Sequence, residues 1–211
     1  MELRPWQRAS AAAVALLAGA ALVLQYVLIL QQKSEQLGGA GWATLEYVSY
    51  FTILSNAIVA AVTFAAARGP MPSWLAGVSA RGAAALYIGV TACIYALVLS
   101  SLWAPVGLQW LADVSLHYAV PLAYLGWWLF AAPHGRLVAT DALRWLVFPL
   151  AYVAWVFVRG SWLHAWPYPF LDVDALGLHA VLRNAAVVCG VFVLGACALV
   201  GIDRLLARTS R

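Results

Sequence analysis

Apolar runs of about 20 residues recur along the chain and constrain its fold more than any other feature. A helix needs roughly 20 residues to cross the hydrocarbon core of a bilayer. Only 9% of the 211 residues are charged, whereas a soluble domain carries about 25%. The sequence therefore predicts an all-α polytopic membrane protein, one domain over residues 1–211 with six transmembrane helices. The predicted spans are residues 9–30, 47–67, 82–102, 111–132, 142–158 and 181–202.

Basic residues set the predicted orientation of these helices. Nine of the twelve Lys and Arg residues lie at the two termini and in the second and fourth connections. Lys33, Arg159 and Arg183 lie on the opposite side. Because cytoplasmic segments are enriched in basic residues, both termini are predicted to be cytoplasmic, in the plasma or inner membrane. The scatter of these residues also argues against nucleic-acid binding, despite the formal charge of +4.

Three connections then face outward, at residues 31–46, 103–110 and 159–180. The last is the longest and is rich in aromatic residues, among them Trp166 and Tyr168. Trp and Tyr side chains favour the interface between membrane and water. We expect this segment to lie at the membrane surface and to form a lid over a site.

Polar side chains interrupt the second apolar run. Ser49, Thr52 and Asn56 are spaced i, i+3, i+7, which predicts that one helical face is polar. Polar groups inside a bilayer are costly and often mark functional sites. A structural role stays open, since Ser and Thr also bond back to the preceding turn or join helices. Asn56 favours a functional role, because an amide needs several partners.

The fourth run contains Asp113, His117 and Pro121. Pro121 has no N–H, so the carbonyl of His117 loses its helical partner and a kink is expected there. Asp113 lies one turn before His117. It either accepts a proton from the imidazole or caps the helix. The histidine itself has either a structural or a catalytic role.

Thr52 and His117 are expected to meet at one depth. Both runs are predicted to cross from outside to inside, and each residue lies about 5–9 Å below the outer end of its helix. Helix N-termini favour an anion or a developing oxyanion. A hydroxyl, an imidazole and an anion-favouring pocket are the groups that acyl transfer requires.

The fifth connection also holds titratable groups, but their spacing matches no zinc or calcium pattern. The residues are His164, Asp172, Asp174 and His179. Ion pairing or simple exposure to solvent explains them as well. No metal site and no cofactor are predicted.

Several short motifs together resemble a known family. They are YFTILSN at residues 50–56, His117 followed by a proline-containing helix, Gly-x-Trp at 160–162 and Trp-Pro-Tyr-Pro-Phe at 166–170. In combination they resemble the androgen-induced gene 1 and androgen-dependent TFPI-regulating proteins and their bacterial six-span relatives. Eukaryotic members are threonine hydrolases that cleave fatty acid esters of hydroxy fatty acids. The resemblance implies that Thr52 is the nucleophile and His117 the base.

The sequence thus predicts a membrane threonine hydrolase that acts on a lipid ester from the extracytoplasmic side. Ser49, Asn56, Asp113, Trp166 and Tyr168 are its predicted supporting residues, for the oxyanion, the histidine or the substrate. One alternative is a lipid-binding or transport protein whose polar cavity is lined by the same residues. Another is an assembly role without chemistry.

Overall fold

The computed structural model describes residues 3–36, 38–69 and 74–209, and every regular element within them is helical. This confirms the predicted all-α class. The longer elements are α1 (Pro5–Lys33), α2 (Ala40–Val48), α3 (Phe51–Arg68), α4 (Val78–Ile94), α5 (Gly107–Val114), α6 (Val120–Phe130), α7 (Ala139–Trp145), α8 (Val147–Leu163) and α10 (Leu178–Thr209). Short turns complete the described chain: η1 (Trp74–Ala76), η2 (Tyr95–Leu99), η3 (Ser115–Ala119), η4 (Pro169–Leu171) and α9 (Val173–Leu176).

Five helical stretches among the described residues are long and apolar enough to cross a membrane. This is the pattern of a multi-pass membrane protein. They are Pro5–Lys33, Phe51–Arg68, Val78–Leu99, Ala139–Leu163 and Leu178–Arg208. The run predicted at residues 111–132 is helical too, but it is divided into α5, η3 and α6.

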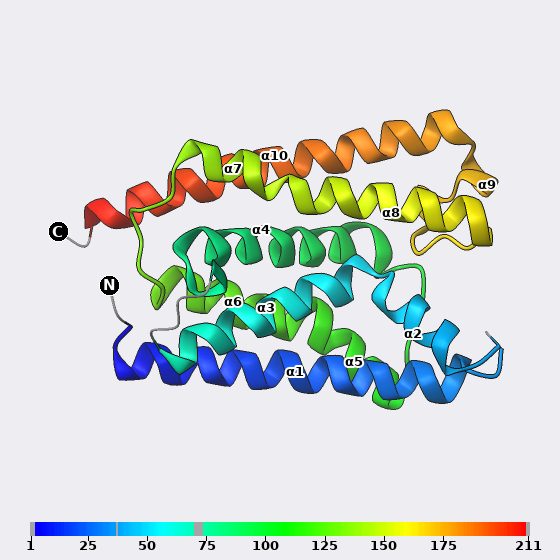
Figure 1. Cartoon of the computed structure of the whole chain (residues 1–211), viewed down its shortest axis with the longest axis horizontal. Coiled ribbons are helices and arrows are strands. Elements are labelled where there is room, and N and C mark those ends of the chain that lie inside the picture. The colour runs from blue at the N-terminus through cyan, green and yellow to red at the C-terminus, as the bar shows by residue number, and fades with distance from the viewer. Residues whose placement is uncertain (1–2, 37, 70–73, 210–211) are drawn as a thin grey trace.

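The helices form a bundle with both termini at one end (Figure 1). The short helices α2 and α9 lie at the other end, and α5 and α6 together run along the length between the two ends. In this bundle α1 packs against α3, α5 and α6, whereas α4 contacts α3, α6 and α10. Helix α4 therefore lies between the layer that contains α1 and the layer that contains α8 and α10.

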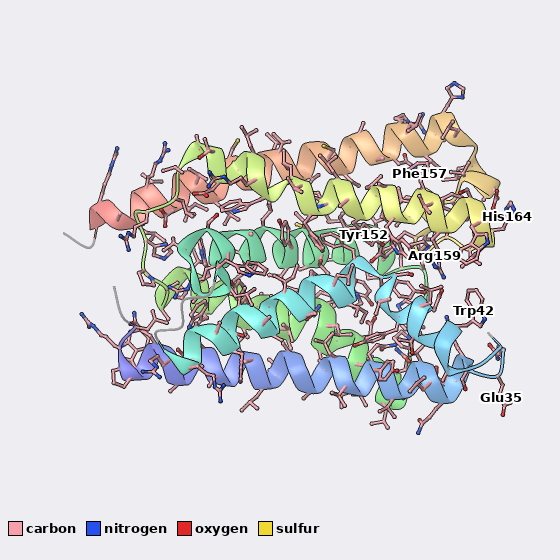
Figure 2. All side chains as sticks on the ribbon, viewed as in Figure 1. Glu35, Trp42, Tyr152, Phe157, Arg159 and His164 are labelled. Atoms are coloured by element: carbon pink, nitrogen blue, oxygen red, sulfur yellow. The ribbon has the colours of Figure 1, made fainter. Side chains whose placement is uncertain are left out.

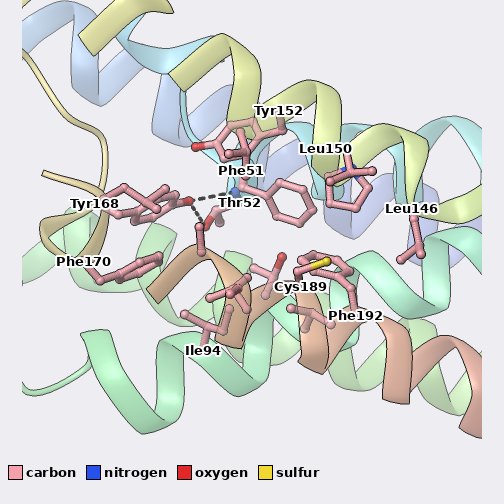
Figure 3. A pocket seen from close by; sticks show the side chains of 18 of the residues that line it. Phe51, Thr52, Ile94, Leu146, Leu150, Tyr152, Tyr168, Phe170, Cys189 and Phe192 are labelled. Atoms are coloured by element: carbon pink, nitrogen blue, oxygen red, sulfur yellow. Dashed lines mark hydrogen bonds between the residues drawn. The ribbon is translucent and has the colours of Figure 1, made fainter. Parts of the chain in front are cut away.

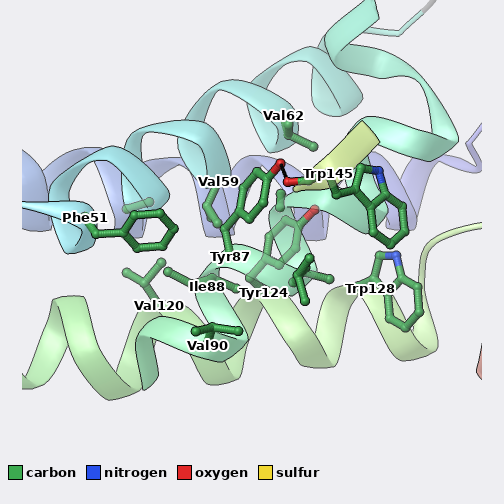
Figure 4. Packing of buried hydrophobic residues seen from close by; sticks show 14 of the residues in the cluster. Phe51, Val59, Val62, Tyr87, Ile88, Val90, Val120, Tyr124, Trp128 and Trp145 are labelled. Carbon is green, nitrogen blue, oxygen red and sulfur yellow. Dashed lines mark hydrogen bonds between the residues drawn. The ribbon is translucent and has the colours of Figure 1, made fainter. Parts of the chain in front are cut away.

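An aromatic core fills the space beside α4 (Figure 4). The Phe51 and Tyr87 rings meet edge to face at 6.3 Å, and the Tyr87 hydroxyl donates to the carbonyl of Trp145 at 2.7 Å. A tyrosine hydroxyl buried in apolar surroundings needs such an acceptor. Close packing around Phe51 fixes the start of α3, and with it the position of the next residue, Thr52.

The predicted single helix over residues 47–67 is wrong at its start. Helix α2 ends at Val48 and α3 begins at Phe51, because Tyr50 between them has an extended backbone (φ −88°, ψ 129°). Ser49 consequently belongs to the end of α2 and does not share a helical face with Thr52. The break also gives Thr52 a place in the first turn of α3.

The predicted span at residues 142–158 is too short. Helix α8 continues to Leu163, so Arg159 lies inside a helix rather than in the outer connection. Its side chain is only 4% exposed and pairs with Glu46 of α2. Figure 2 shows Arg159 at the end of the bundle that holds α2. Burial of a cation with a partner explains how a charged residue can extend an apolar helix.

The irregularity predicted beside Pro121 takes the form of a π-helical turn, η3, which contains His117. A second π turn, η2, follows α4 and begins at Tyr95. Single π turns inside helices are rare and occur often at functional sites. The two turns bring Tyr95 and His117 into contact, as described below.

Candidate active site

Thr52 and His117 meet, as expected from their predicted depths. The Thr52 hydroxyl oxygen lies 3.3 Å from Nε2 of His117. Thr52 is buried and His117 is mostly buried, with its side chain 13% exposed. A nucleophile and a base at this separation are within the range seen before substrate binds, when such hydrogen bonds are often long.

The other ring nitrogen of His117 is held by Asp113. Nδ1 lies 2.9 Å from the backbone carbonyl of Asp113 and 3.2 Å from its carboxylate oxygen Oδ1. Both are acceptors, so Nδ1 carries the proton and Nε2 presents a lone pair to Thr52. Asp113 lies in the last turn of α5, whose N-cap is Val106, so Asp113 does not cap the helix. The structure therefore favours the other expected role of Asp113, as the partner of the His117 imidazole.

Tyr95 completes this arrangement. Its hydroxyl donates to Oδ2 of Asp113, and its ring stacks on the imidazole with centroids 3.7 Å apart and planes 12° from parallel. The imidazole is thereby fixed on one edge and on one face. Tyr95 is not among the residues predicted from the sequence, although Tyr87, Thr91 and Tyr95 recur four residues apart and so share one helical face.

The backbone N–H of Thr52 is in the first turn of α3 and points to Tyr168 (Figure 3). It donates to the Tyr168 hydroxyl at 3.3 Å, and that hydroxyl is 3.5 Å from the Thr52 hydroxyl. Burial raises the pKa of Tyr168 above its ordinary value of 10.0, although hydrogen bonds with Thr52 lower it. Tyr168 therefore stays protonated at physiological pH and keeps a proton to donate.

The remaining polar residues of the second run hold the backbone. Asn56 donates to the carbonyls of Thr52 and Leu116, at 2.8 and 3.1 Å, and so ties α3 to η3. Ser49 is fully buried, but its hydroxyl donates to the carbonyl of Leu45 within α2. The structure thus gives Asn56 a supporting position and does not bring the Ser49 hydroxyl to Thr52.

The fifth connection covers the site through Tyr168 rather than Trp166. The Trp166 ring packs against Gly160, where an added Cβ would come within 2.3 Å of it. Its N–H donates to Asp174 at 2.8 Å, and this hydrogen bond, followed by one from His164, lowers the pKa of that carboxyl. Gly160 is required for this close approach. Trp166 therefore anchors the connection while Tyr168 reaches Thr52.

A buried ion pair joins the same connection to α2. Arg159 of α8 pairs with Glu46 and also donates to the carbonyl of Ala165 at 2.7 Å. Glu46 in turn accepts from the Tyr50 hydroxyl at 2.9 Å. These contacts fix the backbone on both sides of the break between α2 and α3. Within the described ranges, no three His, Cys, Asp or Glu residues gather where a metal ion could bind.

Two cavities meet at Thr52. The smaller, of about 240 Å³, lies between α3, α4, α8 and α10 and is almost entirely apolar. The larger, of about 370 Å³, is lined by α1, α5, η2 and η3 and includes His117 and Asp113. Thr52, Leu99 and Tyr168 line both cavities. Thr52 therefore lies in the wall that the two cavities share.

The site thus joins a hydroxyl, an oriented imidazole, a carboxylate and two hydrogen-bond donors at the junction of two cavities. These are the groups that acyl transfer through a covalent intermediate requires. Compared with family models, curated proteins and solved structures, the chain matches none of them.

Proposed function

We propose that this protein is a membrane-embedded ester hydrolase with Thr52 as nucleophile and His117 as general base. The observation that carries the proposal is the 3.3 Å contact between the Thr52 hydroxyl and Nε2 of His117, in a ring whose other nitrogen faces Asp113. The Thr52 oxygen attacks the ester carbonyl and His117 takes its proton. The bond to the alkoxy oxygen then breaks, and His117 returns the proton to the leaving alcohol.

Water completes the reaction. It attacks the acyl-threonine carbonyl while His117 takes its proton. The bond to the Thr52 oxygen then breaks, His117 returns the proton to that oxygen, and the carboxylic acid leaves. In both steps Asp113 stabilises the imidazolium by charge, since its Oδ1 lies 3.2 Å from Nδ1. The N–H of Thr52 and the hydroxyl of Tyr168 are the proposed donors to the oxyanion.

We place this reaction near the extracytoplasmic face of a plasma or inner membrane. The proposal has six crossings, with Gly107–Phe130 as the fourth, and cytoplasmic termini. The position of both termini at one end of the bundle supports an even number of crossings (Figure 1). The distribution of basic residues supports the orientation. Thr52 then lies at the outer end of its helix.

A lipid ester is the proposed substrate. Apolar residues line most of both cavities, and a site inside a bilayer receives its substrate from the lipid phase. The motif combination that resembles the androgen-induced gene 1 proteins favours esters of fatty acids with hydroxy fatty acids as a first substrate class to test.

The cavities also support a second candidate function, non-enzymatic binding or transport of a lipid or a small solute. In that case Thr52 and His117 line a binding cavity and no covalent intermediate forms.

Reaction of the purified protein with a fluorophosphonate separates the two functions. A hydrolase should gain a phosphonyl group on the peptide that contains Thr52, seen by mass spectrometry, and Thr52→Ala should abolish both labelling and ester turnover. His117→Ala should lower turnover by roughly 10²–10⁴. Thr63→Ala is the matched control, because Thr63 is buried in the same helix and its hydroxyl donates to the carbonyl of Val59. Wild-type turnover in Thr52→Ala would refute the hydrolase proposal.

A further inference from the structure

We infer that the two cavities divide the substrate at its ester bond, with the acyl chain in the smaller cavity and the alcohol in the larger. The smaller cavity, which we call the acyl cavity, takes a medium-length chain of about eight carbons. The larger, the alcohol cavity, takes an alcohol that carries further polar groups. This inference rests on the proposed hydrolase function and adds the class of substrate.

The position of His117 determines which part of the ester enters which cavity. Among the described residues, His117 and Asp113 line the alcohol cavity but not the acyl cavity. The imidazole must protonate the leaving alkoxy oxygen, so that oxygen has to lie on the His117 side of Thr52. The acyl chain, on the other side of the carbonyl, then has the acyl cavity open to it.

The lining of the acyl cavity suits a hydrocarbon chain. Its polar side chains lie toward the Thr52 end, and their hydroxyls have protein partners: Tyr152 donates to the carbonyl of Ser49 at 2.9 Å and Thr91 to that of Tyr87 at 2.9 Å. Leu146 and Phe192 line it farther from Thr52 (Figure 3). Apolar contacts alone therefore remain for a bound chain.

The volume of the acyl cavity limits the length of that chain. A water molecule takes up about 30 Å³ in the liquid, and a methylene group is of similar size. The cavity of about 240 Å³ thus holds on the order of eight such groups. A longer chain has to extend beyond the cavity, and each carbon outside it adds no contact with the protein.

The alcohol cavity differs in its polar residues. In its lining, Nε2 of Gln109 donates to Oε1 of Gln25 at 2.8 Å. Gln32 and Lys33 line it too, and Nζ of Lys33 lies 3.9 Å from Oε1 of Glu46. Amides and an ammonium group offer donors to hydroxyl or acidic groups. An alcohol with such groups is therefore favoured over a plain alkyl alcohol of the same size.

The division of the substrate between the two cavities also explains why the alcohol leaves before water attacks the acyl-threonine. When the alcohol leaves, it vacates the space next to His117, while the acyl chain stays bound through Thr52. Water enters the vacated cavity, where His117 can take its proton as it attacks the acyl-threonine. The products are one carboxylic acid and one alcohol for each water consumed.

The test is a matrix of p-nitrophenyl and alkyl esters, with acyl length varied at a fixed alcohol and alcohol length varied at a fixed acyl group. For wild type, kcat/KM should rise roughly fourfold per acyl methylene until about eight carbons and then level off. Cys189→Phe narrows the acyl cavity and should shorten the preferred acyl chain by roughly two to four carbons, with no change in alcohol preference. Leu146→Ala enlarges the acyl cavity and should lengthen the preferred acyl chain.

Two further variants make the result specific. Cys197→Phe is the matched control, since Cys197 is exposed on the same helix and outside both cavities, and it should leave both preferences unchanged. Gln109→Trp should alter preference for the alcohol but not for the acyl chain.

Failure of the inference differs from failure of the proposed function. If turnover depends on Thr52 but Cys189→Phe and Leu146→Ala change alcohol preference, or leave acyl preference unchanged, the division of the substrate is wrong. If no ester is turned over in a Thr52-dependent way, the hydrolase proposal and this inference are both refuted.

Discussion

The Tyr168 hydroxyl is the most informative single group to remove. In the structure its oxygen accepts the N–H of Thr52 at 3.3 Å, close to the position that a substrate oxyanion would take. If the hydroxyl donates to the oxyanion, Tyr168→Phe should lower kcat by roughly 10²–10³, the cost of losing one such donor, and change KM little. Stability should fall by roughly 1–3 kcal/mol, because both hydrogen bonds with Thr52 are lost while the ring keeps its stacking on Phe170 at 5.3 Å.

The assay is steady-state turnover of a soluble reporter ester in detergent, paired with thermal denaturation. Tyr87→Phe is the matched control, since it removes a buried hydroxyl that donates to the carbonyl of Trp145, away from both cavities. An unchanged or raised kcat in Tyr168→Phe would refute the donor role and show that the hydroxyl only occupies the oxyanion position before substrate binds.

The raised pKa of Tyr168 gives a related expectation for pH. Because the folded protein holds this proton more tightly than the unfolded chain, the group contributes stability below about pH 10, and that contribution is lost as the pH rises further. The wild-type thermal midpoint should therefore fall above pH 10, and more steeply than that of Tyr168→Phe. Equal slopes for the two proteins would contradict the raised pKa.

Three other changes test separate parts of the structure. Asp113→Asn removes the charge beside the imidazolium and should lower kcat by roughly 10²–10⁴ with little change in KM; a normal kcat would exclude a role for that carboxylate. His134→Ala removes the 3.1 Å hydrogen bond with the carboxylate of Asp203, which is 1% exposed, and should lower stability by roughly 1.5–3 kcal/mol in denaturation assays without lowering kcat of the folded enzyme. In a cysteine-free background, Ser161→Cys should react with a membrane-impermeant maleimide from outside the cell and Thr140→Cys only after lysis; the reverse would invert the orientation.

The all-α class and the pairing of Thr52 with His117 could be predicted because they depend on length, hydropathy and depth. A run of about 20 apolar residues has few alternatives in a membrane. Two polar residues at equal depth on helices that run in the same direction can meet if those helices are neighbours. Neither inference needs the details of side-chain packing.

The break at Tyr50 could not be predicted in this way, because the run from Tyr47 to Ala67 contains no proline or glycine that would mark the end of a helix. Its cause is tertiary. The hydroxyl of Tyr152 donates a hydrogen bond to the carbonyl of Ser49, and the ion pair of Arg159 with Glu46 holds α2 against α8. Hydropathy does not report such contacts. It likewise placed Arg159 in a loop, since a paired cation and an exposed one look alike in a sequence.

The role of Tyr95 in the site also could not be predicted from hydropathy. Its hydroxyl contacts Asp113 and its ring covers His117 only because α4 ends in a π turn, and no proline marks that turn in the sequence. Proline does mark the corresponding turn in the fourth run, where Pro121 follows His117. The kink could therefore be predicted at one of the two turns and not at the other.

Three interruptions of regular helix converge at the site: the break before Thr52, the π turn at Tyr95 and the π turn that holds His117. Irregular backbone at membrane depth is tolerated only where it is buried in protein or lines a cavity, because lipid cannot satisfy its polar groups. Here all three residues line the alcohol cavity, and Asn56 satisfies the carbonyls of Thr52 and Leu116. A bundle built only for stability would gain nothing from three such defects in one place. Their convergence on a hydroxyl, an imidazole and the phenol that stacks on it is what a catalytic site at this junction requires.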